Sequence, residues 1–387
     1  MTNFIGGNQI KLLRGGAEYF PALEAAINNA IHEIYLQTYI FELDKAGINI
    51  GNALKQAAQR DVTVNVLLDG FGCKDMPKAY LKELMQAGVQ VVFYRPKISP
   101  WTLKKNRLRR LHRKVTVVDG AVAFVGGINI IDDNNVPDKA PPRIDYAVRV
   151  EGALLPSILS SVYKLWHRAS WRTLQRAKIS NAKAKPASLK RALKDGIDAA
   201  FLLRDNILHR RDIEEAYLIA INQAQSEIII ANAYFLPSRK FRQALLAAAK
   251  RGVKVQLLLQ GRMEYFLMSA THAFYSKFLR SDIEIFEYRK SFMHCKVAVI
   301  DGSWATVGSS NIDPFSMLLA CEANIIVQDK AFSSELRAEI ISSIRADAYQ
   351  VSAQDWVRGN LLKRAMSWVV YELVRVSLGI IGYSNEQ

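Results

Sequence analysis

An internal duplication constrains this chain more than any other feature of its sequence. The segment HEIYLQTYIF (His32–Phe41) parallels SEIIIANAYF (Ser226–Phe235), and AAQRDVTVNVLLDG (Ala57–Gly70) parallels AAKRGVKVQLLLQG (Ala248–Gly261). The two copies lie about 190 residues apart, much further than the period of roughly 20–50 residues that is typical of solenoid repeats. The duplication therefore predicts two fused domains of similar fold.

Each copy alternates between helical and extended patterns. The runs ALEAAINNAI and EEAYLIAINQA have the apolar spacing of helices. The runs VTVNVLL and VKVQLLL are rich in β-branched residues and have the length of buried strands. This alternation predicts an α/β fold in which each half forms a mainly parallel mixed sheet flanked by helices.

The repeat also predicts where the chain divides. We expect an N-terminal domain over residues 1–171, a basic linker over 172–196, a C-terminal domain over 197–350 and an apolar tail over 351–387. The linker is rich in Lys, Arg and Ala, which suits a solvated connector and a membrane-contacting segment equally well.

Charge and cysteine content indicate the kind of partner and the cellular compartment. The formal net charge of +16, from 52 Lys+Arg against 36 Asp+Glu, predicts an anionic partner such as nucleic acid, an acidic membrane surface or a phosphorylated substrate. Cys73, Cys295 and Cys321 match neither a disulfide framework nor a zinc site. The first residues lack the apolar run of a signal peptide, so we expect a protein kept on the cytoplasmic side.

One short motif occurs once in each copy. RRLHRKVTVVDGAVAFVGGIN (Arg109–Asn129) and FMHCKVAVIDGSWATVGSSNID (Phe292–Asp313) share the pattern H-x-K-x4-D-x6-G-[GS]-x-N. A single His-x-Lys would most often be two polar residues on a strand edge. Two copies in matching contexts favour a functional site instead.

The residue types of the motif suit a phosphate. Side chains two positions apart on a strand share a face, so each histidine lies beside its lysine. Lysine supplies charge, asparagine supplies a neutral donor, and imidazole can attack phosphorus or carry a proton. Neither copy has the further histidine or acidic cluster that would hold a metal, and we expect no cofactor. The residues are His112, Lys114 and Asn129 in the first copy and His294, Lys296 and Asn311 in the second.

These segments resemble the two HKD motifs of the phospholipase D superfamily, whose members form a covalent phosphohistidine without a metal. The resemblance covers nearly the whole chain. Through ANAYFLP, HCKVAVIDGSWATVGSSNIDPFS and EANIIV, it is strongest to the bacterial cardiolipin synthases of the B type, which lack N-terminal membrane helices. It implies two phospholipase D-like domains with the active site between them.

The resemblance also implies a reaction. One histidine attacks the phosphorus of phosphatidylglycerol and expels glycerol, and the other protonates the leaving oxygen and then deprotonates the incoming hydroxyl. By family analogy His112 is the nucleophile and His294 the acid and base, although the two motifs are nearly symmetric. The lysines and asparagines of both motifs would stabilise the transition state.

Further residues follow from the family pattern. A nucleophilic histidine needs its far nitrogen held by an acceptor, and Asp145 and Glu322 lie about thirty residues after the two histidines. Asp119 and Asp301 complete the HKD motifs and are counted with the catalytic set. Each stands at an Asp-Gly hairpin turn, however, so we expect a structural role.

The two glycine turns differ between the copies. The first motif has Gly126-Gly127, where many family members have Gly-Ser, and the second has Gly308-Ser309. We therefore expect Ser309 to offer its hydroxyl to the phosphate on one side only.

Three segments bear on the choice between lipid and nucleic acid. Residues 96–114 combine Trp101 with a dense basic run, which suits an anionic membrane or a nucleic-acid groove. Residues 261–281 carry more aromatic side chains than one helix face needs. They could form a lip that contacts acyl chains, or they could belong to the hydrophobic core. The tail at 360–383 suits an interfacial amphipathic helix, or else a helix packed on the body.

We therefore expect a cardiolipin synthase bound peripherally at the cytoplasmic face of the bacterial membrane. Its partners would be anionic phospholipids, namely phosphatidylglycerol and the cardiolipin product, and no nucleic acid is expected. A hydrolytic phospholipase D and a nuclease of the same superfamily remain the alternatives.

Overall fold

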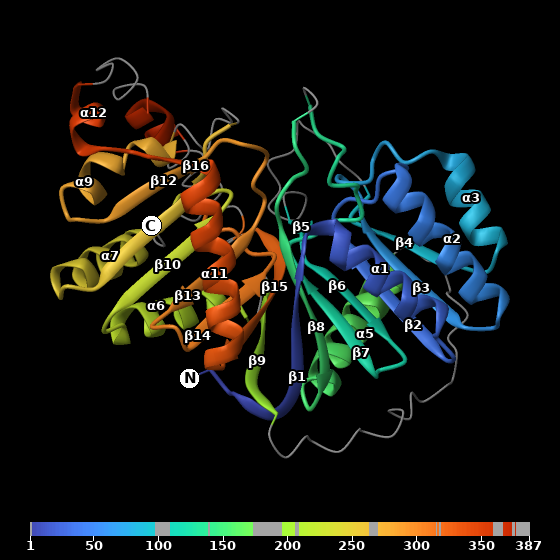
Figure 1. Ribbon diagram of the computed structural model, residues 1–387. Helices are drawn as coiled ribbons and strands as arrows, with labels where there is room; N and C mark the ends of the chain where they lie inside the picture. Colours follow the sequence, from blue (N-terminus) through green and yellow to red (C-terminus); the bar gives the residue numbers. More distant parts are fainter. Residues whose placement is uncertain are drawn as a thin grey trace.

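The structure is a computed structural model, and it describes residues 2–96, 109–137, 140–172, 196–205, 209–262, 270–314, 316, 319–358, 367–373 and 376. Elements β1 to α5 form the N-terminal half and elements β9 to α12 form the C-terminal half (Figure 1). The expected basic linker falls almost wholly outside the described residues, as do Trp101 and most of its basic run.

The N-terminal half consists of β1 (Ile5–Arg14), α1 (Gly15–Asn28), β2 (Glu33–Thr38), α2 (Lys45–Gln59), β3 (Thr63–Asp69), α3 (Lys78–Gln86), β4 (Gln90–Tyr94), β5 (Arg110–Leu111), β6 (Lys114–Val118), β7 (Val122–Gly126), β8 (Tyr146–Gly152) and α5 (Leu155–Arg172). The C-terminal half consists of β9 (Ile197–Arg204), α6 (Asp212–Gln223), β10 (Glu227–Asn232), α7 (Arg239–Lys250), β11 (Lys254–Gln260), α9 (Tyr275–Leu279), β12 (Glu284–Tyr288), β13 (Lys296–Ile300), β14 (Trp304–Gly308), β15 (Ala320–Gln328), α11 (Lys330–Asp347), β16 (Ala348–Gln350) and α12 (Ala353–Arg358).

A single mixed sheet runs through both halves. Its order is β16-β12-β11-β10-β13-β14-β15-β9-β1-β8-β7-β6-β2-β3-β4, and β5 pairs with β15 outside this path. From the central pair β9 and β1, the order β15, β14, β13, β10, β11, β12 on one side matches β8, β7, β6, β2, β3, β4 on the other. The predicted pseudo-symmetric α/β fold is confirmed, and the two halves share one sheet.

Parallel pairing is less extensive than the sequence predicted. Among the described strands of this main path, it is confined to β2-β3-β4 in one half and β10-β11-β12 in the other. The strands between them pair antiparallel, because each HKD segment forms a tight hairpin, β6-β7 or β13-β14, next to a long returning strand. The Asp-Gly turns predicted both hairpins correctly.

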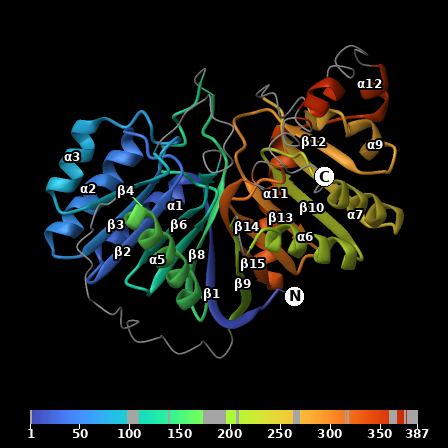
Figure 2. The same cartoon turned by 180° about the vertical axis from the view of Figure 1, so that it is seen from behind.

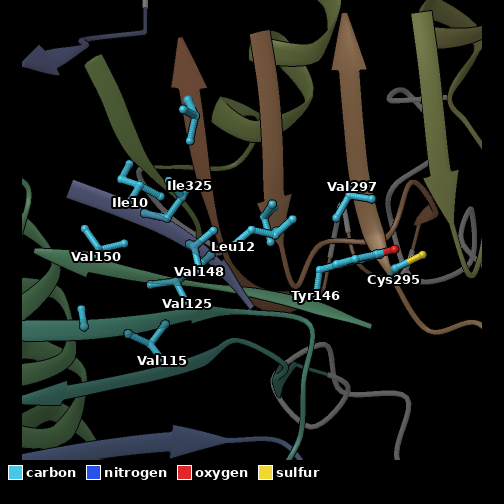
Figure 3. Close-up of a cluster of buried hydrophobic side chains, with 14 of the residues drawn as sticks. Ile10, Leu12, Val115, Val125, Tyr146, Val148, Val150, Cys295, Val297 and Ile325 are labelled. Atoms are coloured by element: carbon cyan, nitrogen blue, oxygen red, sulfur yellow. The ribbon is translucent and has the colours of Figure 1, made fainter. Parts of the chain in front are cut away.

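Helices cover the sheet on both faces (Figure 2). The two long helices α5 and α11 each have 18 residues and follow equivalent strands, β8 and β15. The largest buried cluster is continuous across the centre of the sheet, where Leu12 and Val148 of one half pack in the same cluster as Val297 and Ile325 of the other (Figure 3). The halves are therefore joined by shared hydrophobic core as well as by hydrogen bonds.

The aromatic segment expected at residues 261–281 is core in its described part. Phe274, Tyr275 and Phe278 are buried, so these three do not form a lip for acyl chains. Residues 263–269, which carry the remaining aromatic and methionine side chains of that prediction, lie outside the described residues.

The described part of the tail has two faces. Val370 is buried in the core of the C-terminal half, and Tyr371 packs beside Phe274 with ring centroids 4.9 Å apart. Trp368 and Leu373 are about half exposed, at 50% and 52%. None of the described helices is long and apolar enough to cross a membrane.

Candidate active site

Each HKD histidine is held by a carboxylate from the opposite half of the chain. His112 Nδ1 lies 2.9 Å from Glu322 Oε1, and His294 Nδ1 lies 2.7 Å from Asp145 Oδ2. Both carboxylates are almost completely buried, whereas the histidine side chains keep 16% and 23% exposure. The structure thus brings both predicted acidic residues to the histidines, in a crossed arrangement.

The crossing follows from main-chain pairing between the halves. Strand β5 runs parallel to the start of β15, with Leu111 opposite Cys321, and the N–H of His112 donates to the carbonyl of Cys321 at 3.0 Å. The second half repeats this, because the N–H of His294 donates to the carbonyl of Ile144 at 2.9 Å. Glu322 and Asp145 come next along the chain, so each faces the other half's histidine.

The two lysines fold back onto their own histidines. Lys114 Nζ donates to the carbonyl of His112 at 2.6 Å. Lys296 Nζ contacts the carbonyl of His294, and it lies 2.9 Å from His294 Nδ1 and 3.9 Å from Asp145 Oδ2. Both lysines are buried, so the site concentrates positive charge in a region of low polarity.

Burial sets the protonation of these groups. It lowers the pKa of His112, an effect that Glu322 opposes, and together with Lys296 it lowers the pKa of His294 well below its ordinary value. Burial also lowers the pKa of Lys114 to about 7 and raises the pKa of Asp145 to about 6. Without an anion in the site, both imidazoles are therefore neutral at pH 7, and a neutral ring has a lone pair for attack.

The asparagines of the motifs lie in equivalent places but differ in their contacts. Asn129 Oδ1 accepts the N–H of Ile40 at 3.2 Å. Asn311 Nδ2 donates to Ser316 Oγ at 3.4 Å, and its Oδ1 is a buried atom without a partner among the described residues.

The structure corrects the prediction that Ser309 binds phosphate. Its hydroxyl donates to Glu322 Oε2 at 2.6 Å and accepts the N–H of Ala323 at 3.0 Å. The proton that was expected to reach the phosphate therefore orients Glu322, which in turn holds His112.

The Gly-Gly turn has a separate steric reason. A Cβ at Gly127 would collide with both carboxylate oxygens of Asp145. Asp145 and Glu322 are equivalent in the repeat. The side chain of Asp145 is the shorter of the two, so the turn at Gly127 has to lie closer to its carboxylate. Gly127 therefore leaves room for Asp145, and Ser309 hydrogen-bonds the longer Glu322.

Asp119 and Asp301 do not belong to the catalytic set. Asp119 accepts three main-chain N–H groups, from residues 31, 32 and 33, at 2.8 Å each. Asp301 accepts the equivalent N–H groups of residues 225, 226 and 227. Both have positive φ values, 52° and 50°, at the turn end of their hairpins, away from the histidines. This bears out the structural role expected at the turns and corrects their inclusion among the catalytic residues.

Two residues near His112 were missed by the sequence reasoning. Asp69, fully buried at the end of β3, accepts the N–H of Leu111 at 2.7 Å and so fixes the residue before His112. The ring of Tyr39 lies 5.0 Å from that of His112. Their counterparts in the repeat are Gln260 and Ala233, so this break in the symmetry was a signal available in the sequence.

The described residues contain no group of three or more His, Cys, Asp or Glu side chains placed to hold a metal ion.

The predicted site residues that the structure brings together are His112, Lys114, Asp145, His294, Lys296, Ser309 and Glu322.

The chain is similar to known proteins in sequence and in fold. The sequence matches the family described as "Cardiolipin synthase, PLD-like domain" over residues 23–139 and 217–344. It is 38% identical to cardiolipin synthase B of Shigella flexneri over 387 residues, which is 97% of this chain and 90% of the relative. It is 36% identical to cardiolipin synthase B of Salmonella typhimurium (strain LT2), with the same coverage.

Solved structures share the fold at low identity. The phosphatidylserine synthase of Haemophilus influenzae Rd KW20 superposes with a TM-score of 0.70 at 15% identity, covering 99% of this chain and 97% of that one. The polyphosphate kinase of Porphyromonas gingivalis gives a TM-score of 0.56 at 13% identity, covering 96% of this chain and 53% of that one.

Proposed function

The chain belongs to the phospholipase D-like cardiolipin synthase family, and from this premise we propose that it transfers a phosphatidyl group between two phosphatidylglycerol molecules. The products are cardiolipin and glycerol. The observation that carries the proposal is the pair of crossed histidine–carboxylate contacts, because they place two oriented imidazoles in one site.

In the first step His112 acts as the nucleophile. Its Nδ1–H donates to Glu322, which leaves the lone pair of Nε2 free to attack phosphorus. A P–N bond forms while the bond from phosphorus to the glycerol oxygen breaks. That oxygen takes a proton from His294 and leaves as glycerol.

Substrate binding supports the acid role of His294. Burial lowers the pKa of His294 in the free protein, and Lys296 and Lys114 lower it further. An anionic phosphodiester beside these lysines offsets their charge, and the pKa of His294 rises toward its ordinary value. Substrate binding therefore increases the protonated fraction of His294, which is the form that acts as the acid.

In the second step His294 acts as a base. It removes the proton from a hydroxyl of the second phosphatidylglycerol, whose oxygen attacks phosphorus as the P–N bond to His112 breaks. Lys114 and Lys296 stabilise the charge that develops on the equatorial oxygens in both steps. We assign Asn129 and Asn311 to the same phosphate, as neutral polar contacts.

The test uses purified protein and phosphatidylglycerol vesicles with a chelator present, following cardiolipin, phosphatidic acid and glycerol. Wild type should form cardiolipin and glycerol, and His112→Ala and His294→Ala should form neither. His32→Ala is the matched control, because its side chain is exposed outside the site.

The same assay distinguishes the alternatives. Phosphatidic acid as the main lipid product would make the protein a hydrolytic phospholipase D. Cleavage of DNA without any lipid product would make it a nuclease.

We also propose peripheral binding at the cytoplasmic face of the membrane. The net charge of +16 attracts anionic lipid, and Trp368, Val369 and Leu373 present exposed apolar groups on the tail. Deletion of residues 360–387 should reduce sedimentation with phosphatidylglycerol vesicles. Unchanged sedimentation would exclude the tail as a membrane contact.

A further inference from the structure

Asn232 carries a buried donor that no described residue of the protein accepts. It is the last residue of β10, its side chain is fully buried, and its Nδ2 has no partner among the described residues. A buried N–H group without an acceptor costs free energy, so such groups in folded proteins need an explanation, and a bound ligand is one of them.

The orientation of this amide is fixed by a neighbour. Asn232 Oδ1 accepts the main-chain N–H of Ile312 at 3.3 Å. Turning the amide over would set its NH2 group against that N–H, donor against donor. The oxygen therefore faces Ile312 and the nitrogen faces away from it.

The nitrogen lies beside the second HKD set. Asn232 stands directly opposite Lys296 in the antiparallel pair of β10 and β13. Directly opposite residues present their side chains on the same face, with Cβ atoms about 4.5–5.5 Å apart. Lys296 Nζ contacts His294 on that face, so the free N–H of Asn232 neighbours the groups assigned to the phosphate.

The equivalent residue of the first half makes a different hydrogen bond. The repeat places Thr38 where Asn232 stands in the second half. Thr38 Oγ1 donates to the carbonyl of Ile40 at 2.9 Å, so its only proton is already engaged. The unused donor thus belongs to the His294 side of the site.

We infer that Asn232 Nδ2 donates a hydrogen bond to a non-bridging oxygen of the phosphodiester, on the His294 side of the site. This makes Asn232 a further catalytic residue, and the inference rests on the proposed phosphoryl transfer. The contact turns the phosphorus toward His112 and adds a neutral donor to the two lysines.

Asn232→Asp keeps the oxygen that holds Ile312 and replaces the free NH2 group by oxygen, but it also adds a negative charge beside Lys296, so the neutral variant Asn232→Thr is measured with it. Affinity for inorganic phosphate, measured by calorimetry, should fall at least about tenfold. The rate of cardiolipin formation should fall about 100-fold. Asn232→Thr installs the residue of the first half, and it should lose affinity and rate in the same direction by a smaller factor.

Asn8→Asp is the matched control. Asn8 is equally buried, but its Nδ2 donates to the carbonyls of Ile5 and Ile197 at 2.6 and 3.1 Å. This variant should lower Tm and leave phosphate affinity unchanged, whereas Asn232→Asp removes no hydrogen bond that the described part of the free protein makes.

The outcomes separate the two proposals. Wild-type phosphate affinity and transfer rate in folded Asn232→Asp would overturn the inference, even if wild type makes cardiolipin. Loss of phosphate affinity in both Asn232→Asp and Asn232→Thr, with no cardiolipin from wild type, would support the contact and refute the proposed function, whereas loss in folded Asn232→Asp alone would overturn the contact. Should Asn232→Asp fail to fold, unchanged affinity and rate in Asn232→Thr would overturn the inference. A wild type that neither binds phosphate nor transfers would refute both.

Discussion

Glu322 Oε1 lies 2.9 Å from Nδ1 of His112, a histidine 210 residues earlier in the chain and in the other half of the fold. Asp145 of the N-terminal half makes the corresponding contact with His294 of the C-terminal half. Neither HKD histidine is therefore paired with the acidic residue of its own half.

Removing the charge of either carboxylate should slow transfer without unfolding the protein. Glu322→Gln and Asp145→Asn keep shape but no longer favour the Nδ1–H tautomer or stabilise an imidazolium. We expect kcat to fall by at least about 100-fold, with KM little changed. Steady-state kinetics with Tm as the folding control would check this, and wild-type kcat in both variants would contradict the proposed orientation.

The two glycine turns should not be interchangeable. Gly127→Ser places a Cβ against Asp145, so we expect the carboxylate to be displaced and transfer to be nearly abolished. Ser309→Gly removes one hydrogen bond to Glu322 and should cost about tenfold in rate. Equal losses in the two variants would argue against the steric reason given for Gly127.

The pH dependence of kcat/KM should be bell-shaped. Asp145, whose pKa is raised to about 6, has to be ionised to hold His294, so activity falls as the pH drops through 6. Lys114, whose pKa is lowered to about 7, has to be protonated to stabilise the phosphate oxygens, so activity falls as the pH rises above 7. A flat profile between about pH 5 and pH 9 would refute these assignments.

Lys114→Met should stabilise the folded protein and abolish transfer. The buried ammonium is unfavourable in the folded state, so its replacement should raise the free energy of unfolding by on the order of 2 kcal/mol at pH 7, while transfer is lost. The sign follows from linkage. Between the folded pKa of about 7 and the ordinary 10.5, the unfolded chain binds the extra proton, so wild type gains stability as the pH rises. The advantage of the variant should therefore shrink from pH 7 to 10.5, as denaturant titrations would show.

Asp69 should act through the position of His112. Asp69→Asn weakens the acceptor that holds the N–H of Leu111, and we expect kcat to fall about tenfold. Gln260→Glu is the matched control, because among the described residues the equivalent side chain accepts only from its own turn, at residues 261 and 262. A similar loss in both variants would mean a general effect on folding.

Much of the architecture could be predicted because its signals are local. The duplication, the strand runs and the Asp-Gly hairpins each depend on neighbouring residues, and so does the placing of each lysine beside its histidine. The crossing of the carboxylates depends on β5 pairing with β15 and on Ile144 pairing with Met293, which join residues far apart in sequence. The spacing of about thirty residues within each half gave no hint of it.

The remaining differences arose where one side chain had two possible partners. The hydroxyl of Ser309 could face a phosphate or a carboxylate, and only the position of Glu322 decides between them. Phe274 and Phe278 could face lipid or core, and packing within the C-terminal half decides for core.

The direct pairing of β1 with β9 has a mechanical consequence. Where two lobes are connected by a hinge, they can part to admit a substrate and close over it. Here β1 and β9 pair at Ile5 with Ala199 and at Asn8 with Ile197, and the core beside them is shared, so the two halves are held together as one body. In the proposed reaction glycerol and the second phosphatidylglycerol occupy the same side of the phosphorus, beside His294, so glycerol has to depart before the second lipid arrives.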